Sequence, residues 1–491
     1  MPNSCTDSLR STIPRTTGSP VPSWFKTVAI AVLLAAGSAS MAATAPETYE
    51  QYRQPGLNKP AISQSDILPL VDHLRESALV SVKEIGRSYE DRPIYRLQIG
   101  SGPVRVMMWS QMHGDEPTAT PAIFDLVNFI TAPEQAQWRA GWMDKVALVL
   151  VPMLNPDGAE RNIRHNAQSF DINRDARALQ SPEGRTLMAL AREFEPHFAF
   201  NLHDQDRHYG VGDTGRMATI SVLAPAYNRA RDINDSRARA MQLIGVMTKS
   251  IEPFVGGHIA RYDDTYAYRA FGDTFSGMGI STILVESGAH PGDPNRQVAR
   301  RMNFEMLVTA IDSIAAGSYR DVSPARYDAI PLNEDDAIVD IKIARLTTVE
   351  GDSEYVTDLA INHRGDRARV VDAGDLSNLA GAQTLDASRW LYQPPRPFQL
   401  DANSILTLDD SRYRELLREG YGYFVGDPAL LRVETDLPVA INPRNPQRQR
   451  PLRHRDATFL LRDDAGMRVA VINGQLVELQ APPEAVAGQA R

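Results

Sequence analysis

Cysteine is almost absent from this chain. Its single cysteine, Cys5, lies in the N-terminal leader, so a disulfide framework is excluded for the rest of the 491 residues. A chain of this length is long enough for two or three domains and can stabilise itself by burying apolar cores.

An excess of positive charge is absent as well. The chain has 52 basic and 61 acidic side chains, and without its first 45 residues it has 49 and 60, a formal charge of -11. Nothing in it resembles a broad surface that neutralises phosphates, which argues against a nucleic-acid partner. With 43% hydrophobic and 23% charged residues, the composition is that of an ordinary globular protein.

A long hydrophobic run is missing from the N-terminus, where the apolar residues 28–36 are too few for a comfortable membrane span. They follow Lys26 and precede small residues at 37–45, an order typical of an export signal cleaved near Ala42 or Ala43. No cysteine follows, so a lipid anchor on cysteine is excluded. We therefore expect a signal peptide at 1–45 and an exported, periplasmic or extracellular protein with no stable membrane span. Retention of the leader as an anchor is the alternative.

Strand and helix patterns alternate over residues 46–320. Residues 46–65 are expected to be extended. Helices are predicted at 65–79, after Thr120-Pro121, after Ser181-Pro182, from about 235, and at about 295–316. Apolar runs predict strands at 94–99, 104–112, 145–153, 197–202, 218–223 and 280–285. This alternation, with strands that are apolar throughout, predicts an α/β fold with a mixed, largely parallel central sheet covered by helices on both faces.

The pattern changes after about residue 319. We interpret residues 330–491 as a smaller, mostly β accessory domain of unknown role, without internal repeats. A basic stretch in it could contact anionic envelope polymers, although a solvated loop is the favoured interpretation; it contains Arg444, Arg448, Arg450, Arg453 and Arg455. Short apolar runs punctuated by Gly, Asn and Asp lie at 338–343, 368–371, 437–441, 457–461 and 467–476.

Chemically capable residues follow three of the predicted strands of the α/β region. His113 and Glu116 follow the strand at 104–112, His203 follows that at 197–202, and Glu286 follows that at 280–285. In an open α/β sheet the carboxyl ends of parallel strands share one rim, where ligands bind. Catalytic zinc commonly has three protein ligands and keeps one position for water. Two histidines and two glutamates on one rim therefore predict a hydrolytic zinc site.

Each of these residues has a competing interpretation. His73 and Glu76 have the same spacing as His113 and Glu116, but they lie in a predicted amphipathic helix and are expected to be solvated. His113 differs because it leaves a strand end into Gly114, which allows a tight turn.

His203 has two competitors. His197 lies at the start of the strand and thus on the wrong rim, and His208 lies in the following loop. For Glu286 the alternative is a buried ion pair with an arginine, because a carboxylate at so apolar a strand end needs a partner.

Between these strands, residues 155–158 (Asn-Pro-Asp-Gly) indicate an ordinary turn. Arginines and an asparagine follow it and can bind a carboxylate in bidentate fashion. Local ion pairing of Arg174 with Asp171 or Asp175 is the alternative.

Taken together, these residues resemble the zinc carboxypeptidase family of the carboxypeptidase A and B type. The resemblance covers roughly residues 85–316 and rests on the order of its elements: His113-x-x-Glu116, the Asn-Pro-Asp-Gly turn at 155–158, Arg164, Asn173-Arg174, His203 and Glu286.

The resemblance implies one zinc ion held by His113, Glu116 and His203. It implies Glu286 as the general base, which later gives the proton to the leaving amine. Such a zinc ion lowers the pKa of water to about 7, so a nucleophile exists at neutral pH.

The resemblance further implies that Arg164 stabilises the oxyanion, and that Asn173 with Arg174 binds the substrate's terminal carboxylate. The implied partner is a peptide with a free C-terminal carboxylate. A fixed arginine that binds this carboxylate orients a chain end and makes such an enzyme an exopeptidase.

Several features depart from the family's pattern. The segment between Gly158 and Arg164 is short, so Arg161 is an alternative for the oxyanion role. The family's mobile tyrosine is expected before the last strand, where Tyr268 is favoured over Tyr262 and Tyr266. At the base of a specificity pocket, Asp273 would indicate basic substrate side chains, and Phe271 would indicate apolar ones.

Two other functions compete with a carboxypeptidase. One is an amide hydrolase of the aspartoacylase or desuccinylase type that acts on N-acyl amino acids and has a similar His-Gly-x-Glu start. The other is a non-catalytic, zinc-containing protein that binds an envelope component. The turn at 155–158 and the export signal favour the carboxypeptidase over the first. The presence of every catalytic residue type argues against the second.

Overall fold

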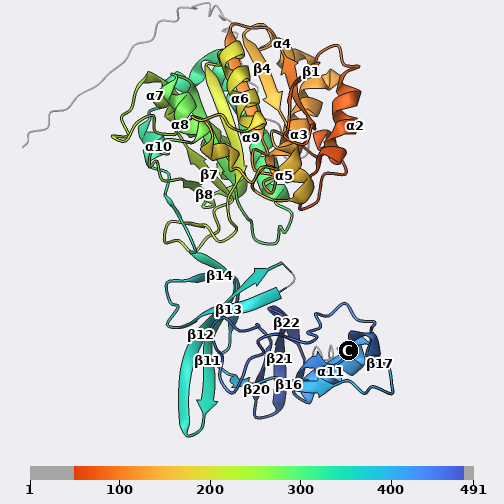
Figure 1. Ribbon diagram of the computed structural model, residues 1–491. Coiled ribbons are helices and arrows are strands. Elements are labelled where there is room, and N and C mark those ends of the chain that lie inside the picture. The colour runs from red at the N-terminus through yellow and green to blue at the C-terminus, as the bar shows by residue number, and fades with distance from the viewer. Residues whose placement is uncertain (1–48, 366, 480–491) are drawn as a thin grey trace, which may run out of the picture. The chain divides into compact units, whose positions relative to one another are not determined.

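The computed structural model describes residues 49–365 and 367–479, so the predicted signal peptide lies outside the described residues. Within them, an eight-stranded mixed sheet forms the centre of the α/β region (Figure 1). The order of its strands is β1 (Ser81–Arg87), β2 (Pro93–Ile99), β4 (Val146–Val151), β3 (Val104–Ser110), β5 (Phe198–Asp204), β9 (Ser281–Ser287), β7 (Ile220–Leu223) and β8 (Ile259–Arg261).

The middle of this sheet is parallel. Strand β3 pairs in parallel with β4 and β5, and β5 pairs in parallel with β9. The outer pairs β1–β2, β2–β4 and β7–β9 are antiparallel, and β7–β8 is parallel. The predicted mixed, largely parallel sheet is therefore confirmed. The carboxyl ends of β3, β4, β5 and β9 lie along one edge.

Helices cover both faces of the sheet. On β3, Val106 and Met108 belong to one apolar cluster, whereas Met107 and Trp109 belong to another, because successive side chains point to opposite faces. The first cluster includes residues of α3 (Ala119–Thr131), α7 (Asp235–Val255) and α9 (Gln297–Ala316). The second includes residues of α6 (Pro182–Phe194) and α8 (Phe271–Gly277). This layering explains why the strands are apolar along their whole length.

Helix starts follow local chemistry. At α6 the Ser181 hydroxyl accepts a hydrogen bond from Gly184 N (3.0 Å) and Pro182 occupies the first turn, as predicted. The predicted cap at Thr120 is wrong, since Thr118 is the N-cap of α3. The Thr120 hydroxyl instead donates to Pro152 O (2.8 Å), because it is buried beside the preceding strand ends.

Two predictions near the N-terminus need correction. The helix predicted at 65–79 is α2 (Gln64–Leu74) and ends at Leu74, where Arg75 N bonds back to Asp72 O in a tighter turn. Residues 49–52, predicted to be extended, form helix α1 (Tyr49–Tyr52), because the Tyr49 hydroxyl donates to the buried Asp125 carboxylate (2.9 Å). Other short helices are α4 (Ala136–Ala140), α5 (Pro156–Arg161), α10 (Ala325–Asp328), and the 3-10 turns η1 (Pro133–Gln135), η2 (Ile172–Arg174), η3 (Ser318–Asp321) and η4 (Pro428–Leu430).

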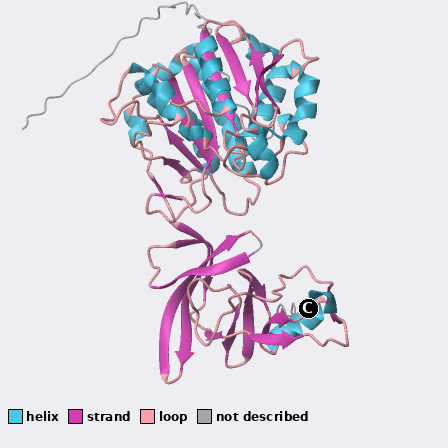
Figure 2. Cartoon of the chain, viewed as in Figure 1, coloured by secondary structure: helices cyan, strands magenta, loops and turns pink. Residues whose placement is uncertain are grey.

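The region after residue 330 is rich in strands, as predicted (Figure 2). The apolar run at 437–441 does not form a strand, since Ile441 forms only an isolated bridge with Phe424. A second eight-stranded sheet has the order β13 (Arg367–Gly374), β12 (Ser353–Arg364), β11 (Ile338–Glu350), β15 (Leu391–Gln393), β20 (Phe459–Asp463), β21 (Gly466–Ile472) and β22 (Gln475–Glu478), with β14 (Ala380–Asp386) also pairing with β11.

Smaller elements complete the β-rich region. Helix α11 (Asp410–Arg418) was not predicted, although Asp409 caps it by accepting from Arg412 N. The basic stretch forms ion pairs within the region, including Arg450–Glu350 (2.9 Å) and Arg453–Asp372 (3.3 Å). The domain boundary near residues 320–330 stays a prediction. Two-stranded ladders join β16 (Arg396–Gln399) to β18 (Tyr421–Val425) and β17 (Leu406–Leu408) to β19 (Leu431–Val433).

No helix within residues 49–365 and 367–479 has both the length and the apolar character that a membrane crossing requires.

Candidate metal centre

The turn that carries His113 and Glu116 follows β3 directly. Glu116 N bonds back to His113 O (3.2 Å), which turns both side chains toward the same point. Gly114 is needed there because an added Cβ would lie only 2.0 Å from the backbone carbon of Gly158. The sequence at 155–158 is therefore more than a turn. It opens α5, with the Asn155 side chain accepting from Gly158 N, and it packs backbone to backbone against the His113 turn.

His203 reaches the same point from β5. Its strand lies between β3 and β9, and in the ladder His203 is the direct partner of Glu286. Partners on adjacent parallel strands lie about 5 Å apart and point to the same face. The parallel centre of the sheet thus places three sequence-distant residues on one rim, as the sequence predicts.

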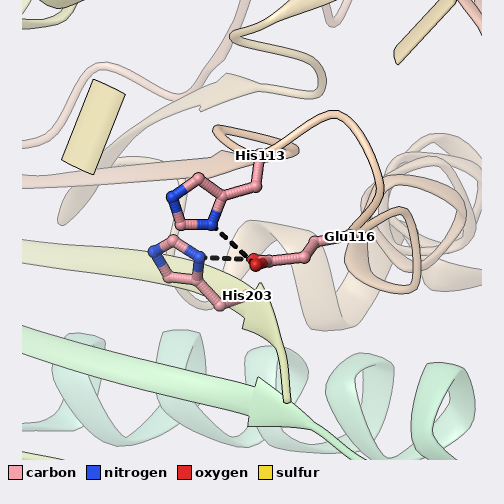
Figure 3. A group of neighbouring side chains, drawn as sticks. All are labelled: His113, Glu116 and His203. Carbon is pink, nitrogen blue, oxygen red and sulfur yellow. Dashed lines mark hydrogen bonds and ion pairs between the residues drawn. The ribbon is translucent and has the colours of Figure 1, made fainter. Parts of the chain in front are cut away.

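The three predicted ligands form a buried cluster (Figure 3). The Glu116 carboxylate lies between the imidazoles, with Oε1 2.7 Å from His113 Nδ1 and Oε2 2.6 Å from His203 Nδ1. One ligand atom from each residue lies within 4.8 Å of the others. Exposed fractions are 1% for His113, 8% for Glu116 and 2% for His203, so solvent does not compete for these atoms.

The donor set fits zinc. Two imidazoles and one glutamate are an established catalytic zinc set, and it leaves a coordination position for another ligand. The outer nitrogens are held as well: His113 Nε2 lies 3.1 Å from Asp171 Oδ1, and His203 Nε2 lies 3.4 Å from Asn173 Nδ2. A carboxylate on the outer nitrogen orients the ring and strengthens it as a ligand.

Protonation preferences also suit a cation. Burial opposes ionisation of Glu116, but His203 and His113 outweigh it and hold the pKa of Glu116 well below its usual range. Burial lowers the pKa of His203, which favours the neutral imidazole that binds metals. Burial also lowers the pKa of His113, but Glu116 and Asp171 outweigh it, and the net effect is a raised pKa. A cation that binds to His113 therefore displaces a proton.

Arg164 rather than Arg161 lies at the cluster. Its Nη1 is 3.0 Å from Glu116 Oε1, and its Nε and Nη2 bind Asp171 Oδ2 at 3.1 and 3.0 Å. Arg161 points elsewhere, forming an ion pair with Glu90 and donating to Asp157 O (3.0 Å). Of the two arginines left open by the sequence, the structure therefore brings Arg164 to the predicted zinc ligands.

Asn173 and Arg174 lie beside the cluster on η2. Asn173 Oδ1 accepts from Phe271 N (3.0 Å), which ties η2 to the start of α8. Arg174 is exposed, and its Nη1 donates to Asn173 O (2.8 Å). The alternative ion pairs do not form, because Asp171 is taken by Arg164 and Asp175 caps the turn before α6 through Ser181 (2.7 Å). The Arg174 side chain is thus accessible to a ligand.

Glu286 lies next to His203 without an arginine within ion-pair distance among the described residues, so the predicted alternative of an ion pair is not seen. Burial raises the pKa of Glu286 well above its ordinary value, and the negative charges of Glu116 and Asp204 add to the effect. Such a carboxylate binds protons tightly, which is the property of a general base that works at neutral pH.

The candidate tyrosines occupy different places. Tyr268 is 60% exposed, and its ring lies 4.8 Å from the Arg177 guanidinium carbon. The Tyr266 hydroxyl accepts from the same arginine (3.4 Å). Tyr262 is nearer the cluster electrostatically: burial raises its pKa, and the charge of Glu286 contributes. The predicted role of Tyr268 stays a prediction.

The possible specificity residues are both on α8. Phe271 is fully buried in the apolar cluster with α6. Asp273 is 7% exposed and accepts from Ala267 N (2.8 Å), and burial raises its pKa to about 6. Their proposed roles in specificity stay predictions.

The competing histidines lie outside the cluster. His73 is on the exposed side of α2, and His197 accepts from Arg105 N (3.0 Å) at the opposite end of β5. His208 pairs with Asp206 and Asp340. Asp171 is the residue that the sequence reasoning missed: it was weighed only as a partner of Arg174, although an acid two residues before Asn-Arg is a usable signal.

Comparison with known proteins supports the resemblance. A family model described as zinc carboxypeptidase matches residues 68–209, which include all three predicted ligands, Arg164, Asn173 and Arg174. Tyr268 and Glu286 lie beyond the matched segment. The resemblance drawn from the motifs is therefore confirmed.

Individual relatives are similar over shorter stretches. The chain is 31% identical over 136 residues to "Probable carboxypeptidase 2" of Trichophyton verrucosum, which covers 27% of this chain and 25% of the relative. It is 27% identical over 146 residues to "Carboxypeptidase SOL1" of Arabidopsis thaliana, covering 26% and 30%. The matched segment spans only about a quarter of the first relative's length, so the activity of the whole protein is a proposal.

Solved structures give a weaker likeness. A metallo-carboxypeptidase from Pseudomonas aeruginosa has a TM-score of 0.43 at 18% identity, covering 52% of this chain and 69% of that one. A carboxypeptidase A from Helicoverpa armigera also has a TM-score of 0.43, at 16% identity, covering 55% and 76%.

Proposed function

We propose that this protein is a zinc metallocarboxypeptidase that hydrolyses the C-terminal peptide bond of peptides. The observation that carries the proposal is the buried cluster of His113, Glu116 and His203, with Glu286 beside His203 on the next strand. An inactive binding protein would not need a half-buried carboxylate with a raised pKa next to this donor set. The family match to zinc carboxypeptidases supports the same conclusion.

One zinc ion would be held by His113, Glu116 and His203. It would supply Lewis acidity, which polarises a carbonyl and makes water nucleophilic near neutral pH. Asp171 and Asn173 would keep the two imidazoles in the orientation that such a ligand set needs.

Glu286 is proposed to move the proton. Its carboxylate accepts a proton from the attacking water and then gives it to the nitrogen of the leaving residue. The raised pKa supports this assignment, because a carboxylate that holds protons tightly is a stronger base. Arg164 is proposed to stabilise negative charge that develops on the carbonyl oxygen, and its guanidinium nitrogen 3.0 Å from Glu116 supports this role.

Asn173 and Arg174 are proposed to bind the terminal carboxylate of the substrate. The guanidinium of Arg174 is exposed, and Asn173 anchors the turn that carries it. Binding the chain end beside the cluster limits cleavage to the last peptide bond. Tyr268, which is 60% exposed, stays the favoured candidate for the mobile tyrosine.

Export is part of the proposal on sequence grounds alone. Lys26, the apolar run at 28–36 and the small residues after it favour secretion to the periplasm or the exterior. Peptides with a free C-terminus are the proposed partners. Residues 330–491 have no assigned substrate of their own.

Replacing Arg174 with alanine tests the chain-end assignment. We expect kcat/KM for a free-acid peptide to fall about 100-fold or more, because a charged hydrogen-bonded pair is lost. The same peptide with an amidated C-terminus, already a poor substrate, should change less than about threefold. Steady-state kinetics on the matched peptide pair measures both. Equal losses for the two substrates would remove Arg174 from carboxylate binding.

The same assay separates the main competing activity. N-acyl amino acids run beside the peptides would be hydrolysed in their place if the protein were an aspartoacylase-type amide hydrolase. Such a result would overturn the proposed peptide specificity while leaving the zinc site in place.

A further inference from the structure

The segment that follows His203 pairs with the start of the β-rich region. This segment, residues 205–211, ends in the short strand β6 (Gly210–Val211). Strand β6 pairs antiparallel with β10 (Asn333–Glu334), and Gly212 N donates to Leu332 O (2.8 Å). Ile338 N also donates to His208 O (3.0 Å). Residues 332–338 thus hold the backbone of the segment next to a predicted ligand.

Asp340, on β11, holds the side chains of the same segment. It is 5% exposed, and its carboxylate forms an ion pair with Arg207 and lies 3.4 Å from His208 Nε2. Its other oxygen accepts from His363 N (2.7 Å) and lies 3.2 Å from the His363 ring. A buried carboxylate is costly unless it is paired, so these contacts fix Asp340 and the segment to each other.

The segment in turn contacts the surroundings of Glu286. Gln205 N donates to Ser287 O (3.0 Å), directly after Glu286, and Gln205 Oε1 accepts from Asn333 Nδ2 (3.3 Å). Gly288 is required at this junction, since an added Cβ would lie 1.9 Å from Ala218 O and 2.6 Å from Gln205 Nε2. The backbone around Glu286 therefore packs tightly against the segment.

Tyr209 extends this contact toward the site. Its ring centroid lies 5.4 Å from that of Tyr262. Burial raises the pKa of both tyrosines, and the negative charge of Glu286 contributes to each. Both tyrosines are half-buried.

We propose that Asp340 is a positioning residue of the hydrolase: with residues 332–338 it holds segment 205–211 and so fixes the rim beside Glu286 where a peptide is bound. The inference rests on the proposed function for its kinetic consequence. It also gives the start of the β-rich region a task, as a support of the active-site rim. A misplacement of the rim by about 1 Å is enough to slow the reaction by one to two orders of magnitude.

The test replaces Asp340 with asparagine in the full chain. The substitution keeps the shape of the side chain and removes the charge that holds Arg207 and His208. We expect about a tenfold fall in kcat, an unchanged zinc content, and faster amide hydrogen exchange in residues 205–211. Arg207→Ala in the same background should add little, because the two residues act through one contact.

Asp358→Asn is the matched control. Asp358 lies on β12 of the same sheet, pairs with Lys342 (3.6 Å) and accepts from Arg345 N (2.8 Å). Neither this ion pair nor this hydrogen bond involves segment 205–211. Asp358→Asn should leave kcat and the exchange of that segment unchanged. Equal effects in both variants would mean general damage to the β-rich region and would overturn the inference.

Hydrogen exchange keeps this test separate from the proposed activity. If the parent hydrolysed no peptide, the proposed function would fail, yet the exchange of residues 205–211 would still be measurable. Unchanged exchange in Asp340→Asn would overturn the positioning role whatever the parent's activity.

Discussion

Glutamine in place of Glu286 is expected to lower kcat by about 10²- to 10⁴-fold, the range contributed by a positioned general base. The substitution keeps the size of a side chain that lies beside His203 on the adjacent strand, but it removes the group that accepts a proton. Zinc content should stay at the parent level, since Glu286 is not among the three clustered ligands. Steady-state kinetics and metal analysis on the same preparation check both statements.

Glu183→Gln is a suitable control for this experiment. Glu183 is fully buried, and burial raises its pKa as it does that of Glu286, but Glu183 accepts from Asn166 Nδ2 (2.9 Å) and Tyr89 N (3.1 Å) at the start of α6. Glu183→Gln removes a buried carboxylate that is not part of the cluster. It should therefore leave kcat within a fewfold of the parent value. A Glu286→Gln protein that keeps its zinc and hydrolyses peptides at the parent rate would remove the general-base assignment.

Alanine in place of His113 is expected to abolish most metal binding. The imidazole supplies one of three protein ligands, and Asp171 orients it through its outer nitrogen. Loss of such an outer partner alone costs about 10- to 100-fold in metal affinity, so loss of the ligand itself should cost more than about 100-fold. Metal analysis after dialysis, followed by a competition titration with a chromogenic chelator, measures the change.

His73→Ala is the matched comparison. His73 and Glu76 repeat the spacing of His113 and Glu116, but His73 lies on the exposed side of α2. Its replacement should change neither zinc content nor rate. A loss of zinc in His73→Ala, or full retention in His113→Ala, would show that the wrong histidine pair was chosen.

The central sheet was predictable because each of its main strands is a continuous apolar run. Most residues of 104–110, 146–151, 198–204 and 281–287 are buried, and such strands need no alternation to be recognised. The run at 437–441 has similar composition but is not a strand. There, side chains such as Leu437 and Ile441 only partly bury themselves against a small cluster. Local hydrophobicity cannot distinguish these two situations.

Helix ends were less predictable than helices. Thr120-Pro121 has the composition of a helix start, yet the tertiary contact of the Thr120 hydroxyl with Pro152 O lets the helix begin earlier. The short helix at 49–52 depends on a hydrogen bond from Tyr49 to Asp125, 76 residues away. Contacts of this kind are not encoded in neighbouring residues.

At the site, the candidate residues that follow strand ends could be predicted from the sequence. The choice between candidate residues on loops could not. His113, Glu116, His203 and Glu286 converge because parallel strands share a rim. The choice of Arg164 over Arg161 depends on the short helix α5, which turns Arg161 toward Glu90. The residues around Arg161 do not predict this orientation.

The support of segment 205–211 by Asp340 was equally invisible in the sequence. Asp340 lies 132 residues after His208 in the sequence, yet its carboxylate contacts the His208 ring. Only the fold brings the two together.

Product mapping on a defined peptide mixture, with and without a zinc chelator, tests the central claim most directly. The account predicts stepwise loss of single residues from free C-termini, cessation of all cleavage with the chelator, and recovery when zinc is restored. Internal cleavage, or cleavage that continues at the same rate in the apo protein, would contradict it.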